Sequence, residues 1–387
     1  MKINRDIANK VLEYIKYYPV VTITGPRQSG KTTLCKMLFP DKPYVSLEKL
    51  SMRRFAIDDP EGFLEKYPEG AILDEIQRAP DLMSYIQTVV DEKDQTGMFI
   101  LTGSQQFELM QNIGQSLAGR TAIVRLLPLS FAEAYSNTVK NMANLEEVIF
   151  KGFFPRIFDK SIPPLEAMSS YVSTYLERDL RLLINIKDLS GFEVFLKLCA
   201  GRTGQMINMS HLANDCGVSH NTIKSWLSIL ETSFLIKLTR PYYRNFNKRL
   251  VKTPKLYFLD TALVCYLLGI QNPEQLETHP LKGFIFETYV LMELLKNRFN
   301  KGLSDNIYYF RDNTGNEVDF ILDNGQQLDI VEVKAGKTIN SDFFKNLYFF
   351  EKNSTLKTKS HLIFAGKENH FQNKVKVISW DKISANF

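Results

Sequence analysis

The stretch of this sequence with the most specific chemistry runs from Gly25 to Thr32 and fits the pattern GxxxxGK[ST] without a gap. A β-branched run precedes it and a helical pattern follows it, which is the strand–loop–helix context of a phosphate-binding loop rather than of a chance glycine-rich turn. Gly25 and Gly30 can adopt a positive φ and bring backbone N–H groups against phosphate oxygens. Lys31 is then expected over the β- and γ-phosphates, and the Thr32 hydroxyl on Mg²⁺. The predicted nucleotide-binding residues are Gly25, Pro26, Arg27, Gln28, Ser29, Gly30, Lys31, Thr32 and Thr33.

Two carboxylates follow the next strongly apolar run, at Asp74 and Glu75. A buried strand that ends in acids delivers them to the ligand-binding edge of a parallel sheet. Asp74 is expected to hold Mg²⁺, directly or through water, and Glu75 to polarise the attacking water. A strand that ends in Asp-Glu is common by itself, so this prediction depends on its position behind the glycine loop.

Small polar residues and one arginine complete the predicted nucleotide site. Thr102 and Ser104 end a further apolar strand and are candidates to hydrogen-bond the γ-phosphate or the attacking water. A helix N-cap is an equally good account of Ser104. Arg120, beside Gly119, is the candidate stabiliser of phosphate charge, in cis or from a neighbouring subunit. A surface salt bridge is the alternative for Arg120.

Together these stretches resemble the bacterial and archaeal AAA-type ATPases that carry a DUF4143 domain. The resemblance extends over nearly the whole chain and implies a RecA/AAA-like nucleotide core followed by a helical lid and a winged helix. Carried over by position, it makes Lys31 and Thr32 Walker A residues, Asp74 and Glu75 Walker B residues, Thr102 to Ser104 the sensor stretch, and Arg120 the arginine of the Gly-Arg motif. It implies no particular biological task. The matching stretches are Gly25–Leu34, Ile72–Pro80, Leu101–Ser104, Leu117–Arg120 and Pro128–Phe131.

Residues 210–227 have the pattern of a helix-turn-helix. Ser210 is expected to cap a first helix, Gly217 to supply the turn and Ser219 to cap a second helix. The second helix is expected to expose Lys224, and the basic, aromatic stretch behind it resembles a wing. The predicted DNA contacts are Lys224, Arg244, Lys248 and Arg249. A winged helix that serves only protein packing is the alternative.

A second set of chemical residues occupies the last third of the chain. Glu287 lies in an apolar helical stretch, Asp319 on a predicted strand, and Glu332 and Lys334 on one face of the next strand. The order resembles a PD-(D/E)xK nuclease core. The resemblance makes Glu287 the helix acid, Asp319 and Glu332 ligands of Mg²⁺ or Mn²⁺, and Lys334 the residue that orients or deprotonates water. The alternatives are a structural salt bridge and a degenerate nuclease fold that only binds nucleic acid or protein.

Length and composition set the frame for these motifs. The 387 residues suggest two or three domains, and 44% apolar with 24% charged residues is ordinary for a folded chain. The net charge of +5 permits DNA as a partner without requiring it. The four cysteines are scattered, so neither a disulfide framework nor a zinc site is indicated, and a cytoplasmic location without a membrane partner is expected.

The expected fold class is α/β. A P-loop RecA/AAA-like parallel sheet core is predicted for residues 1–128, a helical lid plus winged helix for 129–255, and a C-terminal restriction-endonuclease-like α/β domain for 256–387, with the DUF4143 region covering roughly the second and third parts. The expected function is a Mg²⁺-dependent ATPase coupled to DNA binding, with metal-dependent DNA cleavage by the C-terminal domain as a further activity and a homo-oligomer as the assembly. The alternative function is a nucleotide-switched interaction or regulatory module whose nuclease-like domain is inactive.

Overall fold

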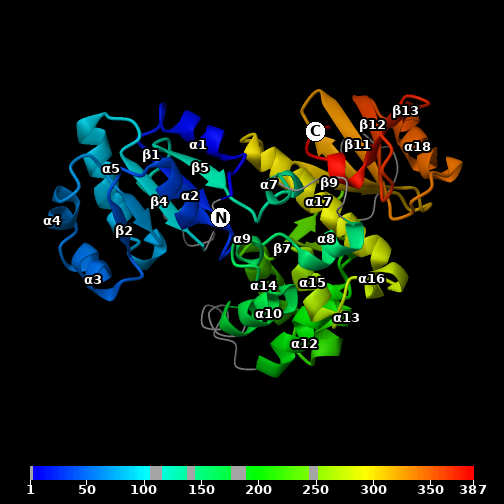
Figure 1. The fold of residues 1–387 in the computed structure, drawn as a ribbon, viewed down its shortest axis with the longest axis horizontal. Helices are drawn as coiled ribbons and strands as arrows, with labels where there is room; N and C mark the ends of the chain where they lie inside the picture. The colour runs from blue at the N-terminus through cyan, green and yellow to red at the C-terminus, as the bar shows by residue number, and fades with distance from the viewer. Residues whose placement is uncertain (1–2, 105–115, 137–143, 176–188, 244–251) are drawn as a thin grey trace. The chain divides into compact units, whose positions relative to one another are not determined.

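The computed structural model describes residues 3–104, 116–136, 144–175, 189–243 and 252–387 (Figure 1). The chain divides into two compact units. The first consists of Met1–Leu129, Thr232–Phe234 and Arg298–Leu303. The second consists of Ser130–Glu231, Leu235–Asn297 and Ser304–Phe387. No helix among these described ranges is both long and apolar enough to span a membrane.

The first unit is built on a parallel sheet whose described strands follow the order β2-β3-β4-β1-β5. Figure 1 labels β2, β4, β1 and β5 of this sheet. Because all strands run the same way, their C-terminal ends open onto one edge of the sheet, where ligands bind in folds of this kind. The strands of this sheet are β1 (Val20–Thr24), β2 (Tyr44–Ser46), β3 (Ile72–Asp74), β4 (Phe99–Gly103) and β5 (Thr121–Arg125).

Helices cover both faces of this sheet. Val21 and Ile23 of β1 pack in one apolar cluster with α1 and α2, whereas Val20 and Leu73 pack in a second cluster with α3, α4 and α5. Burial on both faces explains why the strands read as continuous apolar runs instead of alternating ones. The helical segments are α1 (Ala8–Tyr14), α2 (Lys31–Leu38), α3 (Leu50–Asp58), α4 (Pro60–Glu65), η1 (Ile76–Arg78) and α5 (Leu82–Lys93).

The second unit begins with short helices and a small antiparallel sheet in the order β6-β8-β7. Ser130 and Glu133 form a reciprocal capping box at the first of these helices. The helices are α7 (Phe131–Ala134), α8 (Leu145–Lys151), α9 (Pro155–Asp159), α10 (Pro164–Tyr171), α12 (Leu189–Ala200), α13 (Met209–Cys216), α14 (His220–Thr232), α15 (Thr261–Leu267) and α16 (Gln275–Thr278). The strands are β6 (Gln205–Met206), β7 (Ile236–Thr239) and β8 (Lys255–Phe258).

The rest of the second unit is a mixed sheet in the order β13-β14-β12-β11-β10-β9, with the long helix α17 (Lys282–Asn300) before it in the chain. β9, β10 and β11 form an antiparallel meander, and β11, β12 and β14 run parallel. The fold is therefore α/β, with a parallel P-loop-type sheet and a separate mixed-sheet domain, as predicted. The remaining elements are β9 (Ile307–Arg311), β10 (Glu317–Asp323), β11 (Gln327–Lys334), η4 (Ser341–Phe344), α18 (Lys345–Asn353), β12 (Lys357–Phe364), β13 (His370–Gln372), β14 (Val375–Ser379) and η5 (Trp380–Lys382).

Candidate functional site

The predicted phosphate-binding loop joins β1 to α2. Gly25 has a φ of 152°, and a Cβ at this position would lie 2.1 Å from the carbonyl oxygen of Leu126, so only glycine fits beside the end of β5. Gly30 has a φ of 95° and is the N-cap of α2, which places Lys31 in the first turn of the helix. The Lys31 Nζ donates to the carbonyl oxygens of Gly25 at 3.0 Å and Pro26 at 2.9 Å. Burial lowers the pKa of Lys31.

Asp74 collects hydroxyl donors at the C-terminal end of β3. Thr32 Oγ1 lies 3.0 Å from Asp74 Oδ1, the Tyr44 hydroxyl lies 2.6 Å from Oδ2, and Thr102 Oγ1 also donates to Oδ1. Strand pairing explains this convergence, because β3 lies between β2 and β4 in the sheet. Thr32 and Asp74, the residues predicted to hold Mg²⁺, are therefore in direct contact. Carboxylate and hydroxyl oxygens are ligands that suit Mg²⁺, so this donor set fits the ion.

Glu75 lies in a turn between β3 and η1 with a φ of 61°, a left-handed conformation that is uncommon for this residue type. Its carboxylate accepts hydrogen bonds from Ser104 Oγ at 3.1 Å and from the Gln77 amide. Its backbone N–H donates to Thr102 Oγ1 at 3.3 Å. The two predicted sensor residues, Thr102 and Ser104, thus contact the two predicted Walker B acids.

Tyr44 and Gln77 are site residues that the sequence did not reveal. Tyr44 reaches Asp74 because Ser46 pairs with Asp74 in the parallel β2–β3 ladder, a relation that no local pattern encodes. Gln77 lies inside the stretch that resembles the AAA-type ATPases, but nothing in the pattern identifies an amide two residues after the acid as its partner. Arg27, from the predicted nucleotide-binding set, lies 3.6 Å from Glu48, and Thr33 is exposed on α2.

Arg120 lies at the N-terminal ends of the parallel strands, whereas the predicted phosphate-binding loop lies at their C-terminal ends. Its carbonyl oxygen accepts from the N–H of Val20, the first residue of β1, whereas the loop follows the last residue of β1. A five-residue strand separates the two edges by roughly 15 Å. The Arg120 side chain is 33% exposed and pairs with Asp91 at 2.5 Å. Of the two predicted ways for Arg120 to act on nucleotide, action within its own subunit is therefore wrong, and action on a neighbouring subunit stays a prediction.

The helix-turn-helix consists of α13 and α14, with one difference at its first cap. Asn208, and not Ser210, caps α13, because the Asn208 side-chain oxygen accepts from the N–H groups of Ser210 and His211. Gly217 ends α13 with a φ of 66°, as predicted for the turn. The Ser219 hydroxyl accepts from the N–H of Thr222 at 3.1 Å, as predicted for the second cap.

The second helix of this motif is amphipathic in the predicted sense. Its buried side chains include Ile223, Trp226 and Leu227. The exposed side chains on its other side include His220, Asn221, Lys224 and Ser225. β7 and β8 form the antiparallel pair that follows. Three of the predicted DNA contacts, Arg244, Lys248 and Arg249, lie outside the described residues.

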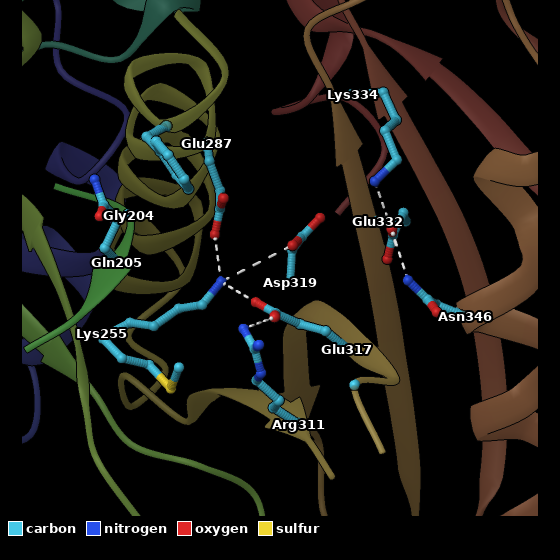
Figure 2. A pocket seen from close by; sticks show the side chains of 13 residues that line it. Gly204, Gln205, Lys255, Glu287, Arg311, Glu317, Asp319, Glu332, Lys334 and Asn346 are labelled. Carbon is cyan, nitrogen blue, oxygen red and sulfur yellow. Dashed lines mark hydrogen bonds and ion pairs between the residues drawn. The ribbon is translucent and has the colours of Figure 1, made fainter. Parts of the chain in front are cut away.

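The four residues predicted for the C-terminal domain line one cavity of about 600 Å³ (Figure 2). Glu287 comes from α17, Asp319 from β10, and Glu332 and Lys334 from β11. Lys334 Nζ lies 2.5 Å from Glu332 Oε1, so the two side chains share one face of β11 as predicted. Asp319 Oδ2 accepts from the N–H of Val333 at 2.7 Å, across the antiparallel pair of strands.

Lys255, from β8, is the central cation of this cavity, and the sequence did not reveal it. Its Nζ lies 3.0 Å from Glu287 Oε1, 2.5 Å from Glu317 Oε1 and 4.0 Å from Asp319 Oδ1 (Figure 2). Burial disfavours the charged amine, but Glu287 and the other surrounding acids hold the pKa of Lys255 well above its usual value. The local signal that could have identified it is a lysine in an otherwise apolar strand, which indicates a buried charge that needs a partner.

The carboxylates of the cavity are strongly desolvated. Burial raises the pKa of Glu287 to about 7, and burial together with the charge of Asp319 raises the pKa of Glu332 to about 8. The described residues contain no group of three or more His, Cys, Asp or Glu side chains arranged to hold a metal ion. Asp319 and Glu332 line the same cavity without forming part of such a group.

Three known families match successive parts of the chain. An AAA domain matches residues 17–135, a domain of unknown function, DUF8612, matches 142–274, and another, DUF4143, matches 282–383. The DUF4143 match is shorter than the region that we expected from the sequence, because DUF8612 covers the part before it. The chain thus carries an AAA domain and a DUF4143 domain.

Comparisons over most of the chain give distant relatives. An uncharacterised protein of Mycobacterium tuberculosis is 29% identical over 326 residues, which cover 82% of this chain and 71% of that protein. An uncharacterised protein of Haemophilus influenzae is 22% identical over 363 residues, which cover 86% of this chain and 87% of the other. Among solved structures, a Walker-type ATPase of Pyrococcus abyssi is similar over 69% of this chain and 96% of its own, with 14% identity and a TM-score of 0.44.

Proposed function

Because the chain combines an AAA domain with a DUF4143 domain, we propose that it is a Mg²⁺-dependent ATPase coupled to DNA binding. The observation that carries the first part is the meeting of Lys31, Thr32 and Asp74 at the C-terminal edge of the parallel sheet, with Glu75 beside them. ATP hydrolysis by the purified chain, with and without Mg²⁺, tests it. A chain that neither binds nor hydrolyses ATP would overturn it.

The chain's own residues divide the work of hydrolysis. Lys31 supplies a buried positive charge at the loop, where it favours bound phosphate groups. Thr32 and Asp74 would hold Mg²⁺, which when bound neutralises phosphate charge. Glu75 is the group that accepts a proton or hydrogen bond from the attacking water. Ser104 and Gln77 fix its carboxylate, and fixed catalytic geometry lowers the barrier.

Arg120 is the proposed source of charge stabilisation between subunits. Its side chain is partly exposed at the edge of the sheet away from its own loop, so it can serve only a site on another copy of the chain. Asp91 holds the guanidinium in a two-pronged contact, with Nε at 2.5 Å and Nη2 at 2.7 Å, and so fixes its orientation before assembly. This role requires a homo-oligomer in the active state.

Binding of DNA through the helix-turn-helix is the second part of the proposal. The exposed polar side chains of α14 around Lys224 support it.

DNA binding should weaken when alanine replaces all four predicted contacts, Lys224, Arg244, Lys248 and Arg249. The salt dependence of binding should also flatten by roughly one unit of slope per lost phosphate contact. Fluorescence anisotropy over a salt titration measures both. Lys357→Ala, at an exposed position of β12, is the matched control. Unchanged affinity and slope in the fourfold variant would favour the protein-packing interpretation.

The C-terminal cavity allows two interpretations. The convergence of Glu287, Asp319, Glu332 and Lys334 supports metal-dependent DNA cleavage, whereas the position of Lys255 among the acids supports an inactive relative of the nuclease fold that acts as an interaction module. We propose the second interpretation, because the buried ammonium group of Lys255 lies 4.0 Å from Asp319, one of the two predicted metal ligands, where it would compete with a divalent cation.

Cleavage assays separate the two interpretations. We expect no cleavage of single- or double-stranded DNA with Mg²⁺ or Mn²⁺, with or without ATP. Gel assays at several protein concentrations measure this, with the Asp319→Ala and Lys334→Ala variants as controls for a contaminating nuclease. Cleavage that needs the metal and is lost in both variants would establish the nuclease interpretation instead.

A further inference from the structure

We propose that Lys255 is the resident cation of the C-terminal cavity and takes the place among its acids that a divalent metal ion would need. This inference rests on the proposal that the C-terminal domain does not cleave DNA, and it is independent of the proposed ATPase. It assigns Lys255, a residue outside the Glu-Asp-Glu-x-Lys series, the role of holding the cavity together. The role is one of positioning, since no reaction is attributed to the lysine.

The charges of the cavity nearly balance without any added ion. Its lining contains the acids Glu287, Glu317, Asp319 and Glu332 and the cations Lys255, Arg311 and Lys334. Each cation contacts at least one of these acids: Arg311 lies 2.8 Å from Glu317, Lys334 lies 2.5 Å from Glu332, and Lys255 lies between the remaining carboxylates (Figure 2). With all four acids ionised one negative charge is left over, and the raised pKa values of Glu287 and Glu332 leave less than that near neutral pH. The acids therefore do not supply the two spare negative charges that would balance a divalent ion.

The carboxylate oxygens are also occupied in a way that leaves little room for a metal ion. Glu287 Oε1 accepts from both Lys255 Nζ and the Tyr257 hydroxyl. Asp319 Oδ2 is bound to the N–H of Val333. Glu332 differs, because its Oε2 is buried and has no hydrogen-bond partner within the described part of the chain. This oxygen is an acceptor that a cation entering the cavity can use without displacing a hydrogen-bond donor.

The backbone of β8 fixes the position of Lys255. β8 is the middle strand of its sheet, and Lys255 pairs with Met206 on one side and with Thr239 on the other. Its side chain is only 4% exposed, and Nζ lies 5.6 Å from the centre of the Tyr309 ring. A buried ammonium group is costly unless it is paired, so the surrounding acids and this lysine stabilise one another.

Manganese binding tests the inference directly. Mn²⁺ is titrated into the 387-residue chain without nucleotide, and free Mn²⁺ is measured by electron paramagnetic resonance. The parent and Lys255→Arg, which keeps the charge, should bind Mn²⁺ weakly at this cavity. Lys255→Met, which removes the charge and keeps most of the length, should bind it about tenfold more tightly or better. The double variant Lys255→Met/Asp319→Asn should lose this gain, which separates the cavity from the nucleotide site.

Thermal unfolding provides a second readout. Mn²⁺ should raise the Tm of Lys255→Met and leave that of the parent almost unchanged, because a ligand stabilises only the state that binds it. If Lys255→Met does not fold, Lys255→Met/Glu287→Gln takes its place, since it removes one carboxylate together with the lysine. Tight Mn²⁺ binding by the parent that depends on Asp319 would overturn the inference. So would a folded lysine variant that binds Mn²⁺ no better than the parent.

Discussion

Glu75→Gln should lower the rate of ATP turnover by about 10²- to 10⁴-fold and leave ATP affinity close to that of the parent. The amide keeps the size and hydrogen-bonding reach of the side chain but cannot accept a proton from water. Ser104 and Gln77, which contact the parental carboxylate, would still face the same position. Single-turnover hydrolysis measures the chemical step, and titration with a fluorescent ATP analogue measures binding.

Two further variants make this result specific. Lys31→Ala should lose ATP binding itself, because it removes the buried charge that favours the phosphates before any reaction occurs. Glu61→Gln, an exposed glutamate of α4, makes the same chemical change outside the site and should change neither quantity. If Glu75→Gln hydrolyses ATP at the parental rate, Glu75 is not the residue that acts on water.

The parts of the nucleotide site that the sequence predicts are those carried by local pattern. An apolar run, a glycine loop and a helical pattern are contiguous, so β1, the loop and α2 could be placed from periodicity and residue type alone. The acids Asp74 and Glu75 follow from the same rule, since parallel strands end at one edge. What the pattern leaves out are groups delivered by neighbouring strands, such as Tyr44 on β2.

Two differences from the sequence predictions have definite physical causes. Ser210 and Asn208 are both good N-cap residues two positions apart, and only the backbone decides which side chain faces the free N–H groups. Arg120 follows a glycine in a stretch that resembles a catalytic motif, but the residue type says nothing about which edge of the sheet it occupies. The parallel register of β1 and β5 places it at the edge where the strands begin.

In the C-terminal domain, too, the local sequence pattern does not reveal a group that long-range packing brings into the site. Glu287, Asp319, Glu332 and Lys334 were predicted to meet, and they line one cavity. Lys255 enters that cavity from a strand of a different sheet, more than 30 residues before the nearest of them in the chain. A motif can therefore locate a group of acids, while the charge that neutralises them depends on long-range packing.

Arg120→Ala should reduce ATP turnover by about 10³-fold in the assembled protein, the effect typical of an arginine that neutralises charge on a transferring phosphate. ATP affinity should change much less, because the binding residues Lys31 and Thr32 belong to the other subunit's own loop. Steady-state turnover measured over a range of protein concentrations also reveals whether activity rises with assembly. Arg54→Ala, an exposed arginine of α3, is the matched control.

A mixing experiment distinguishes action between subunits from every other role of Arg120. Arg120→Ala chains keep a complete Glu75 site, and Glu75→Gln chains keep the arginine, so mixed oligomers contain some interfaces with both groups intact. Turnover of the mixture should clearly exceed the sum of the two variants measured alone. If Arg120→Ala retains parental turnover, the residue is only the surface partner of Asp91. If turnover falls and mixing of demonstrably assembled chains restores none, Arg120 does not act on a neighbouring nucleotide site. Since Arg120 also lies too far from its own loop, the proposed catalytic role would then be wrong.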